Sequence, residues 1–283
     1  MLDKRHGDLS KPHSDSNTYT LGSIGKHNVV IACLPEGKYG TNAAANVVSL
    51  LAGTFPSIRS CLVVGIGGGI PSNKVRLGDV VVGSPTDKFP GVVQWDMGKT
   101  KQGGGFERTG ALDNPPNALL TAVSKLISDN DLNGSKIPLY LDEFKARYPK
   151  AAKKYLRSDS LVDICFRANY DHVSPVRLDR NSSGEDGDDE EEEEVEEENG
   201  FCRFCDKTKV VKRKPRDMSV HYGLIASGNQ VIKDARSRDK LNESLDGKVL
   251  CVEMEAAGIR AAHPSERRSS RSIFNNILNL TTP

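Results

Sequence analysis

The sequence predicts an α/β fold of three layers, with helices on both faces of a central mixed β-sheet. Residues 28–34, 43–53 and 62–64 have the patterns of a strand, a helix and a strand in close succession. Such a succession with a short return is typical of a parallel crossover. Residues 221–227, 232–245 and 249–253 repeat the order strand, helix, strand later in the chain. We therefore expect helices to cover a sheet that contains parallel strands.

A glycine-rich stretch stands at the centre of the first unit. Leu62 to Val64 form a short apolar run that predicts a strand buried on both faces, and Gly65, Gly67, Gly68 and Gly69 follow. A loop of glycines can bring its backbone N–H groups close to a ligand, although a plain turn between two core strands fits the same residues. Residues 75–83 predict the next strand.

This stretch does not predict a dinucleotide site. Counted from Gly65, the third glycine of the G-x-G-x-x-G pattern falls on Ile70, and a proline and a strand follow where a helix is required. A phosphate-binding P-loop is also excluded, because no Lys-Ser or Lys-Thr stands at the required spacing.

Composition limits the class of protein. The 283 residues carry a net charge of +1, and no apolar run reaches the length of a membrane span or a signal peptide core. The six cysteines do not resemble a secreted disulfide framework. We expect a cytoplasmic protein, with a nuclear location left open and no membrane partner.

The N-terminal third predicts several further elements. Residues 1–18 form a polar leader, and 19–24 with 28–34 predict a β-hairpin. Thr41 or Asn42 is expected to cap the helix over 43–53. The segment 89–110 contains Trp95 and predicts a surface loop with a short strand, or alternatively a loop that closes over a ligand.

The middle of the chain is strongly charged. Twelve acidic residues lie between Glu185 and Glu198, which predicts a disordered insertion, and a basic run from Lys207 to Arg216 follows. We expect this basic run to pair with the acidic segment, so a nucleic-acid partner is not predicted. Cys202 and Cys205 have no second cysteine pair at zinc spacing. His172 or His221 could complete a site in space, but nothing in the sequence requires it, and we predict no metal site.

The residues Glu253, Met254 and Glu255 carry the clearest chemistry. They follow a predicted buried strand, the position at which open α/β sheets place ligands. A carboxylate there can accept hydrogen bonds from two adjacent sugar hydroxyls, and a thioether can pack against the sugar. A helix-opening glutamate beside a core methionine would give the same pattern.

In their order, the motifs VVGIGGGIP, LGDVVV, GLIASGNQVIKD and VEMEAAG resemble the nucleoside phosphorylase/nucleosidase superfamily, in particular its fungal branch. The resemblance covers about Tyr19 to Gly258, and includes an acidic and basic insertion at about 173–219. It implies a three-layer domain that cleaves the N-glycosidic bond of a purine nucleoside with phosphate or water. It implies no cofactor beyond phosphate as a co-substrate, and it allows a homo-oligomer.

The resemblance also assigns residues. Glu255 and Met254 would bind the ribose, and Glu253 would support the base or ribose side. Val231 falls where the family places a base-stacking side chain, and Gly67 with Gly68 would approach the sugar and the phosphate or water. Ile66 stands where many relatives carry Ser or Thr, which favours water over phosphate.

The chain also departs from the family pattern at both ends. The family's opening strand and loop have no counterpart upstream of the leader, and residues 259–283 are expected to be a divergent basic tail without a strand. This tail contains no aspartate, so the general acid that protonates the leaving purine is missing and the catalytic residue is unknown. The resemblance therefore leaves open whether the chain cleaves nucleosides or is a non-catalytic, regulatory nucleoside- or nucleotide-binding module.

Overall fold

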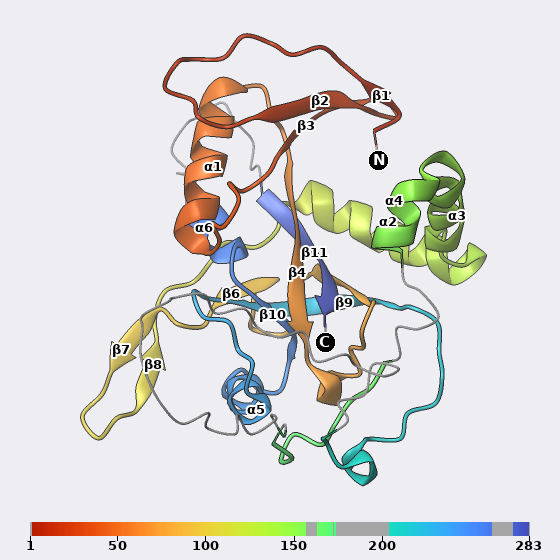
Figure 1. Cartoon of the computed structure of the whole chain (residues 1–283). Coiled ribbons are helices and arrows are strands. Elements are labelled where there is room, and N and C mark those ends of the chain that lie inside the picture. The colour runs from red at the N-terminus through yellow and green to blue at the C-terminus, as the bar shows by residue number, and fades with distance from the viewer. Residues whose placement is uncertain (1, 157–162, 172, 174–203, 262–273, 283) are drawn as a thin grey trace, which may run out of the picture. The chain divides into compact units, whose positions relative to one another are not determined.

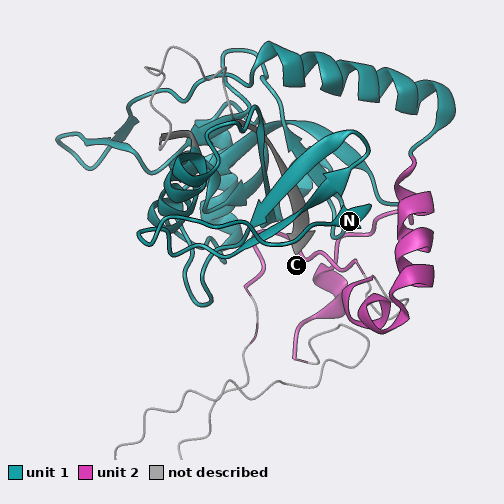
Figure 2. Ribbon diagram, turned by 90° about the horizontal axis from the view of Figure 1, so that it is seen from above, with its two compact units in different colours: residues 1–135, 217–283 teal, residues 136–216 magenta. Residues whose placement is uncertain are grey.

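The computed structural model describes residues 2–156, 163–171, 173, 204–261 and 274–282, and from residue 260 onward it describes the backbone alone. The chain divides into two compact units, residues 1–135 with 217–283 and residues 136–216 (Figure 2). The predicted acidic segment lies outside the described residues. Among the described residues, no helix is both long and apolar enough to cross a membrane.

The larger unit is built on a mixed six-stranded sheet, as the sequence predicts (Figure 1). Strand β9 pairs in parallel with three strands, β5, β6 and β10, whereas β4 pairs antiparallel with β10. In spatial order the strands are β10 (Val249–Glu253), β4 (Cys61–Gly69), β11 (Phe274–Thr282), β5 (Val80–Gly83), β9 (Val220–Ser227) and β6 (Val92–Gln94).

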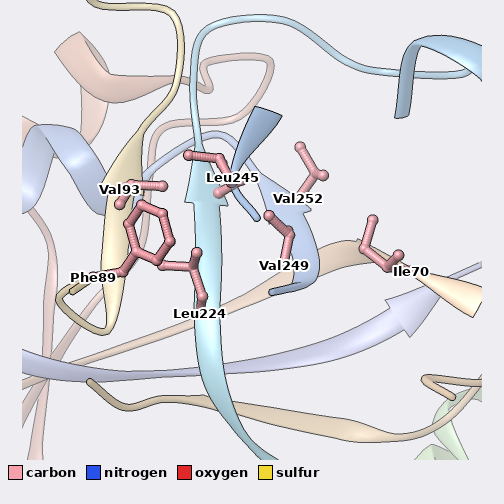
Figure 3. Close-up of a cluster of buried hydrophobic side chains, with 8 residues drawn as sticks. Ile70, Phe89, Val93, Leu224, Leu245, Val249 and Val252 are labelled. Carbon is pink, nitrogen blue, oxygen red and sulfur yellow. The ribbon is translucent and has the colours of Figure 1, made fainter. Parts of the chain in front are cut away.

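Helices cover both faces of this sheet. On one face, Leu224 of β9 and Val249 of β10 pack in a cluster that also includes Leu245, at the end of α5 (Ala235–Ser244) (Figure 3). On the other face, Ile225 packs in a second cluster that shares Val63 with the residues under α1 (Thr41–Thr54) and α6 (Ala256–Ala261). Because consecutive residues of β9 point to opposite faces, both clusters are anchored on one strand. The three-layer prediction is confirmed.

The strand at Phe274–Thr282 corrects the sequence analysis. The prediction that residues 259–283 contain no strand is wrong, because β11 pairs in parallel with β4 and antiparallel with β5. Three asparagines interrupt this segment, and asparagine is depleted in strands. The pairing of its backbone with two strands more than 190 residues away in the sequence is not visible in local pattern.

The glycine-rich stretch also differs from the prediction. Residues 65–69 continue β4 as an extended strand, and none of these glycines has a positive φ. The expectation that Leu62 to Val64 are buried on both faces is wrong as well. Leu62, Val64 and Ile66 are 55%, 68% and 62% exposed, while Val63 packs under α1.

The predicted hairpin is confirmed as β2 (Tyr19–Ile24) and β3 (His27–Ala32), joined through Gly25 at a φ of 55°. These strands form a separate sheet with β1 (Lys4–Arg5), so β3 and β4 are not partners in a parallel crossover as predicted. The predicted polar leader contributes to the fold, since Asp15 and Asn17 are buried and Asn17 Nδ2 donates to the carbonyl of Val47 at 2.8 Å.

The remaining elements are short or peripheral. The segment that contains Trp95 forms β6 and a small hairpin, rather than a loop with one strand. In the larger unit lie the hairpin strands β7 (Gly98–Thr100) and β8 (Phe106–Arg108) and the helix α2 (Asn117–Asn133), with a 3₁₀ turn at Pro71–Asn73.

The smaller unit contains α3 (Ile137–Arg147), α4 (Pro149–Tyr155) and a 3₁₀ turn at Lys207–Lys209. Within it, Arg213 of the basic run donates to Asp163 Oδ1 at 2.7 Å. This residue of the basic run therefore has a carboxylate partner outside the acidic segment.

Two isoleucines of the central sheet give a matched stability test. Ile225 is 0% exposed in the core, and Ile66 is 62% exposed on β4. We expect Ile225→Ala to lower the free energy of unfolding by about 2–5 kcal/mol, because it leaves a cavity. We expect Ile66→Ala to lower it by less than about 1 kcal/mol. Urea unfolding followed by circular dichroism measures both, and equal losses would contradict the arrangement of the sheet.

Candidate functional site

Three parallel strands end together at one edge of the central sheet. Gln94 ends β6, Ser227 ends β9 and Glu253 ends β10, and Ser227 is the register partner of both other residues. Open α/β sheets bind ligands beyond the carboxyl ends of their strands. This edge is therefore the candidate site, and two of its residues come from segments that the sequence analysis singled out.

Glu253 opens the helix that follows β10. Its Oε2 atom accepts hydrogen bonds from the backbone N–H groups of Glu255 and Ala256, at 2.9 and 3.0 Å. The side chain is 4% exposed, and this burial raises the pKa of the Glu253 carboxyl above its ordinary value, against the lowering effect of these hydrogen bonds and of Ser227. Among the described residues, nothing donates to its Oε1 atom. Glu253 is thus a buried carboxyl with one unsatisfied oxygen.

Glu255 has a more open position. It is half-buried, and its Oε1 atom accepts a hydrogen bond from the backbone N–H of Gly40 at 3.2 Å. Gly40 directly precedes α1, so the carboxylate lies at the positive end of that helix. No other described residue is a hydrogen-bond donor to this carboxylate, which leaves its second oxygen available to a ligand.

The start of α1 corrects another prediction. Neither Thr41 nor Asn42 caps the helix with its own side chain; Gly40 is the N-cap. Asn229 supplies the missing acceptor from the turn after β9, since its Oδ1 atom accepts from Thr41 N at 3.1 Å and from Thr41 Oγ1 at 2.8 Å. The N–H groups at a helix start need acceptors from elsewhere, and here a distant side chain provides one.

Asp96 completes the set of polar contacts. Its Oδ2 atom accepts from the backbone N–H of Asn229 at 2.7 Å, and its Oδ1 atom accepts from Gln94 Nε2 at 3.1 Å. Sequence reasoning did not identify Asp96, Asn229 or Thr41 as site residues. The one available signal was that Asn229 lies two residues beyond the end of a predicted strand, as Glu255 does.

The structure places the predicted glycines beside the site. Gly68 is the register partner of Val252, one residue before Glu253. However, an added Cβ atom at Gly68 would meet nothing within 4 Å, so the described residues do not require a glycine there. The two glycines form part of a strand next to the carboxylates, and not the expected loop.

The two other predicted residues differ in position. Met254 lies between the two glutamates and is half-buried. Val231 lies two residues beyond Asn229 and is 63% exposed, so it is not part of the buried cluster around Glu253.

The cysteines and histidines are the residues that could form a metal site. Cys202 and His172 lie outside the described residues, and His221 is in contact with Asp79, with 2.8 Å between Nε2 and Oδ2. Within the part of the chain that the structure describes, no group of three His, Cys, Asp or Glu side chains could hold a metal ion.

Comparison with known proteins identifies a protein of similar sequence among those with a curated description. No family model matches the chain. A protein of Hyaloscypha variabilis named nucleotide-binding leucine-rich repeat (NLR)-like protein is 44% identical over 262 residues, which cover 92% of this chain. The same residues cover 23% of the relative, so the chain spans about a quarter of that protein's length.

Solved structures identify the fold. The 5'-methylthioadenosine/S-adenosylhomocysteine nucleosidase from Borrelia burgdorferi, bound to adenine, matches 99% of this chain and 78% of its own with a TM-score of 0.53 and 14% identity. The corresponding enzyme of Neisseria meningitidis, in complex with methylthio-immucillin-A, matches 99% of this chain and 77% of its own at 0.50 and 14%. This chain has the nucleosidase fold.

Two helices of this fold make a close contact beside the candidate site. An added Cβ atom at Gly258 of α6 would overlap the carbonyl group of Thr41, the first residue of α1. Gly258 therefore allows α6 and α1 to approach each other at the site.

Two helical glycines test this contact. We expect Gly258→Ala to lower the free energy of unfolding by about 1–3 kcal/mol, because the methyl group overpacks the contact with Thr41. Gly53 lies in α1 with nothing within 4 Å of an added Cβ, so we expect Gly53→Ala to raise it by about 0.5–1 kcal/mol. Thermal unfolding measures both changes. Changes of the same sign would show that the close approach of α6 to α1 is not required.

The buried carboxyl predicts a pH dependence of stability. At a pH above 4.5, the ordinary pKa of a glutamate, Glu253 in the folded chain keeps a proton that the unfolded chain has lost. The folded chain then binds more protons, so this group lowers stability as the pH rises from about 4.5 towards the raised pKa. We expect Glu253→Gln to reduce the loss of stability between pH 5 and pH 7. Urea titrations of both chains at the two pH values measure it, and an equal loss in both would count against a raised pKa.

Proposed function

We propose that this chain binds a purine nucleoside at the Glu253–Glu255 corner and cleaves its N-glycosidic bond with water or phosphate. The observation that carries the proposal is Glu255, a half-buried carboxylate two residues beyond the end of β10 that accepts a hydrogen bond through one oxygen. The nucleosidase fold and the sequence resemblance support it.

The proposed binding uses the chemistry of a ribose. Its two adjacent hydroxyls are donors, and hydrogen bonds to an ionised acceptor are stronger than those between neutral groups. The second carboxylate oxygen of Glu255 would accept them, and Met254 would pack against the sugar. We assign Glu253 and Val231 to the base side and Gly67 with Gly68 to the sugar and the attacking group, as the resemblance implies.

The proton donor limits the rate of cleavage under this proposal. A leaving purine needs a proton, and general acid catalysis contributes roughly 10²–10⁴ in rate. Residues 259–283 contain no aspartate to supply it. We therefore expect the 283-residue chain to bind a nucleoside and to release its base slowly. The same observation favours the second candidate, a regulatory nucleoside-binding domain of a longer protein, and the size of the NLR-like relative agrees with it.

Calorimetry with adenosine tests the binding. We expect Glu255→Gln to weaken adenosine binding roughly 10- to 100-fold, because hydrogen bonds to a charged group contribute about 1.5–3 kcal/mol. Glu243 is exposed on α5, and Glu243→Gln is the matched control that should leave the affinity unchanged.

The outcomes separate the candidates. Chromatography of the same mixtures, with and without phosphate, measures free adenine. Binding that depends on Glu255 with adenine release supports an N-ribosyl-cleaving enzyme, and binding without release supports the regulatory domain. Equal affinity of the native chain and Glu255→Gln, or no binding to either, would reject the proposed site.

A further inference from the structure

We propose that Asp96 is a positioning residue which, through Asn229, holds the first residues of α1 against Glu255. The expected effect of Asp96 on nucleoside binding rests on the proposed function. The structural part of the inference concerns contacts between four segments that lie far apart in the sequence and meet at one edge of the sheet.

The end of β6 holds the turn after β9 at three consecutive residues. The N–H of Trp95 donates to the carbonyl of Ser227 at 3.0 Å, and the indole of Trp95 packs where a side chain at Gly228 would otherwise stand. Asp96 Oδ2 then accepts from both nitrogens of Asn229, at 2.7 Å from the backbone N and 3.4 Å from Nδ2. The orientation of the Asn229 amide is thus set by Asp96.

Asn229 connects Asp96 to the start of α1 through the other end of its side-chain amide. Because its Nδ2 faces Asp96, its Oδ1 faces Thr41 and accepts both the backbone N–H and the hydroxyl. Gly40 has a φ of 91°, and an added Cβ atom would lie 3.2 Å from Asn229 Oδ1. The backbone angle favours a glycine here, and an added Cβ atom would require the Asn229 side chain to shift by a few tenths of an ångström.

The last contact involves Glu255, the residue proposed to bind the ribose. The N–H of Gly40 donates to Glu255 Oε1 at 3.2 Å, so the position of the Gly40–Thr41 backbone affects the orientation of the Glu255 carboxylate. Without Asp96, the Asn229 amide could rotate, Thr41 would lose its acceptor, and the carboxylate would lose its anchor. We therefore expect Asp96 to affect nucleoside affinity although it contacts Glu255 only through intermediates.

Three variants test the relay. Asp96→Ala removes the acceptor. Asn229→Asp keeps the acceptor for Thr41 but places a second carboxylate beside that of Asp96, and the two repel each other. The double variant Asp96→Asn/Asn229→Asp removes this repulsion and restores a hydrogen-bond donor between the two side chains. Asp129→Asn, an exposed residue of α2, is the matched control.

The first readout needs no ligand. We expect amide hydrogen exchange at Gly40 and Thr41 to accelerate at least about tenfold in Asp96→Ala and in Asn229→Asp, as loss of a hydrogen bond to a charged group predicts. In the double variant Asp96→Asn/Asn229→Asp we expect exchange to return towards the native rate, while the amides of α5 remain unchanged throughout. A purely structural role would not produce recovery in the double variant.

The second readout is adenosine affinity. We expect about tenfold weaker binding in Asp96→Ala and Asn229→Asp, with recovery in the double variant and no change in Asp129→Asn. The inference is overturned if Gly40 and Thr41 exchange at the native rate in the single variants. It is also overturned if the single variants bind adenosine with native affinity while Glu255→Gln loses binding. If the native chain binds no adenosine, the proposed function fails, and the exchange pattern alone then supports or overturns the positioning of α1 by Asp96.

Discussion

The parallel pairing of β9 with β6 and β10 is the constraint on which the rest of the site depends. It brings Gln94, Ser227 and Glu253 to the same edge of the sheet, although they lie 133 and 26 residues apart along the chain. The strand is buried on both faces, with Leu224 and Ile225 in separate core clusters. Its register is therefore fixed by packing, because a shift by one residue would exchange the two faces.

The start of α1 is the second structural element at this edge, and two of its N–H groups donate to acceptors outside the helix. Glu255 accepts from Gly40, and Asn229 accepts from Thr41. Gly258 allows the backbones of α1 and α6 to touch there. Glu255 and Gly258 from the start of α6 and Asn229 from the turn after β9 thus all contact one helix end, which couples the stability of this corner to the orientation of Glu255.

The sequence identified most regular elements of the core, because their apolar periodicity and turn residues are local. The hairpin of β2 and β3, the helix α1 and the strands β9 and β10 belong to this group. It missed β11, whose asparagine-rich segment becomes a strand only between β4 and β5. It also took residues 65–69 for a loop, since glycine permits a turn but does not require one.

For the candidate site, local pattern was enough to predict two glutamates where a buried strand ends and a helix opens, because one continuous segment carries them. The folded chain shows which carboxylate is buried and which is open, and it adds Asp96, Asn229 and Thr41 to the site. It left Val231 exposed. These features depend on contacts between distant segments, such as the hydrogen bond between Gly40 and Glu255, which are 215 residues apart, and local sequence pattern does not record such contacts.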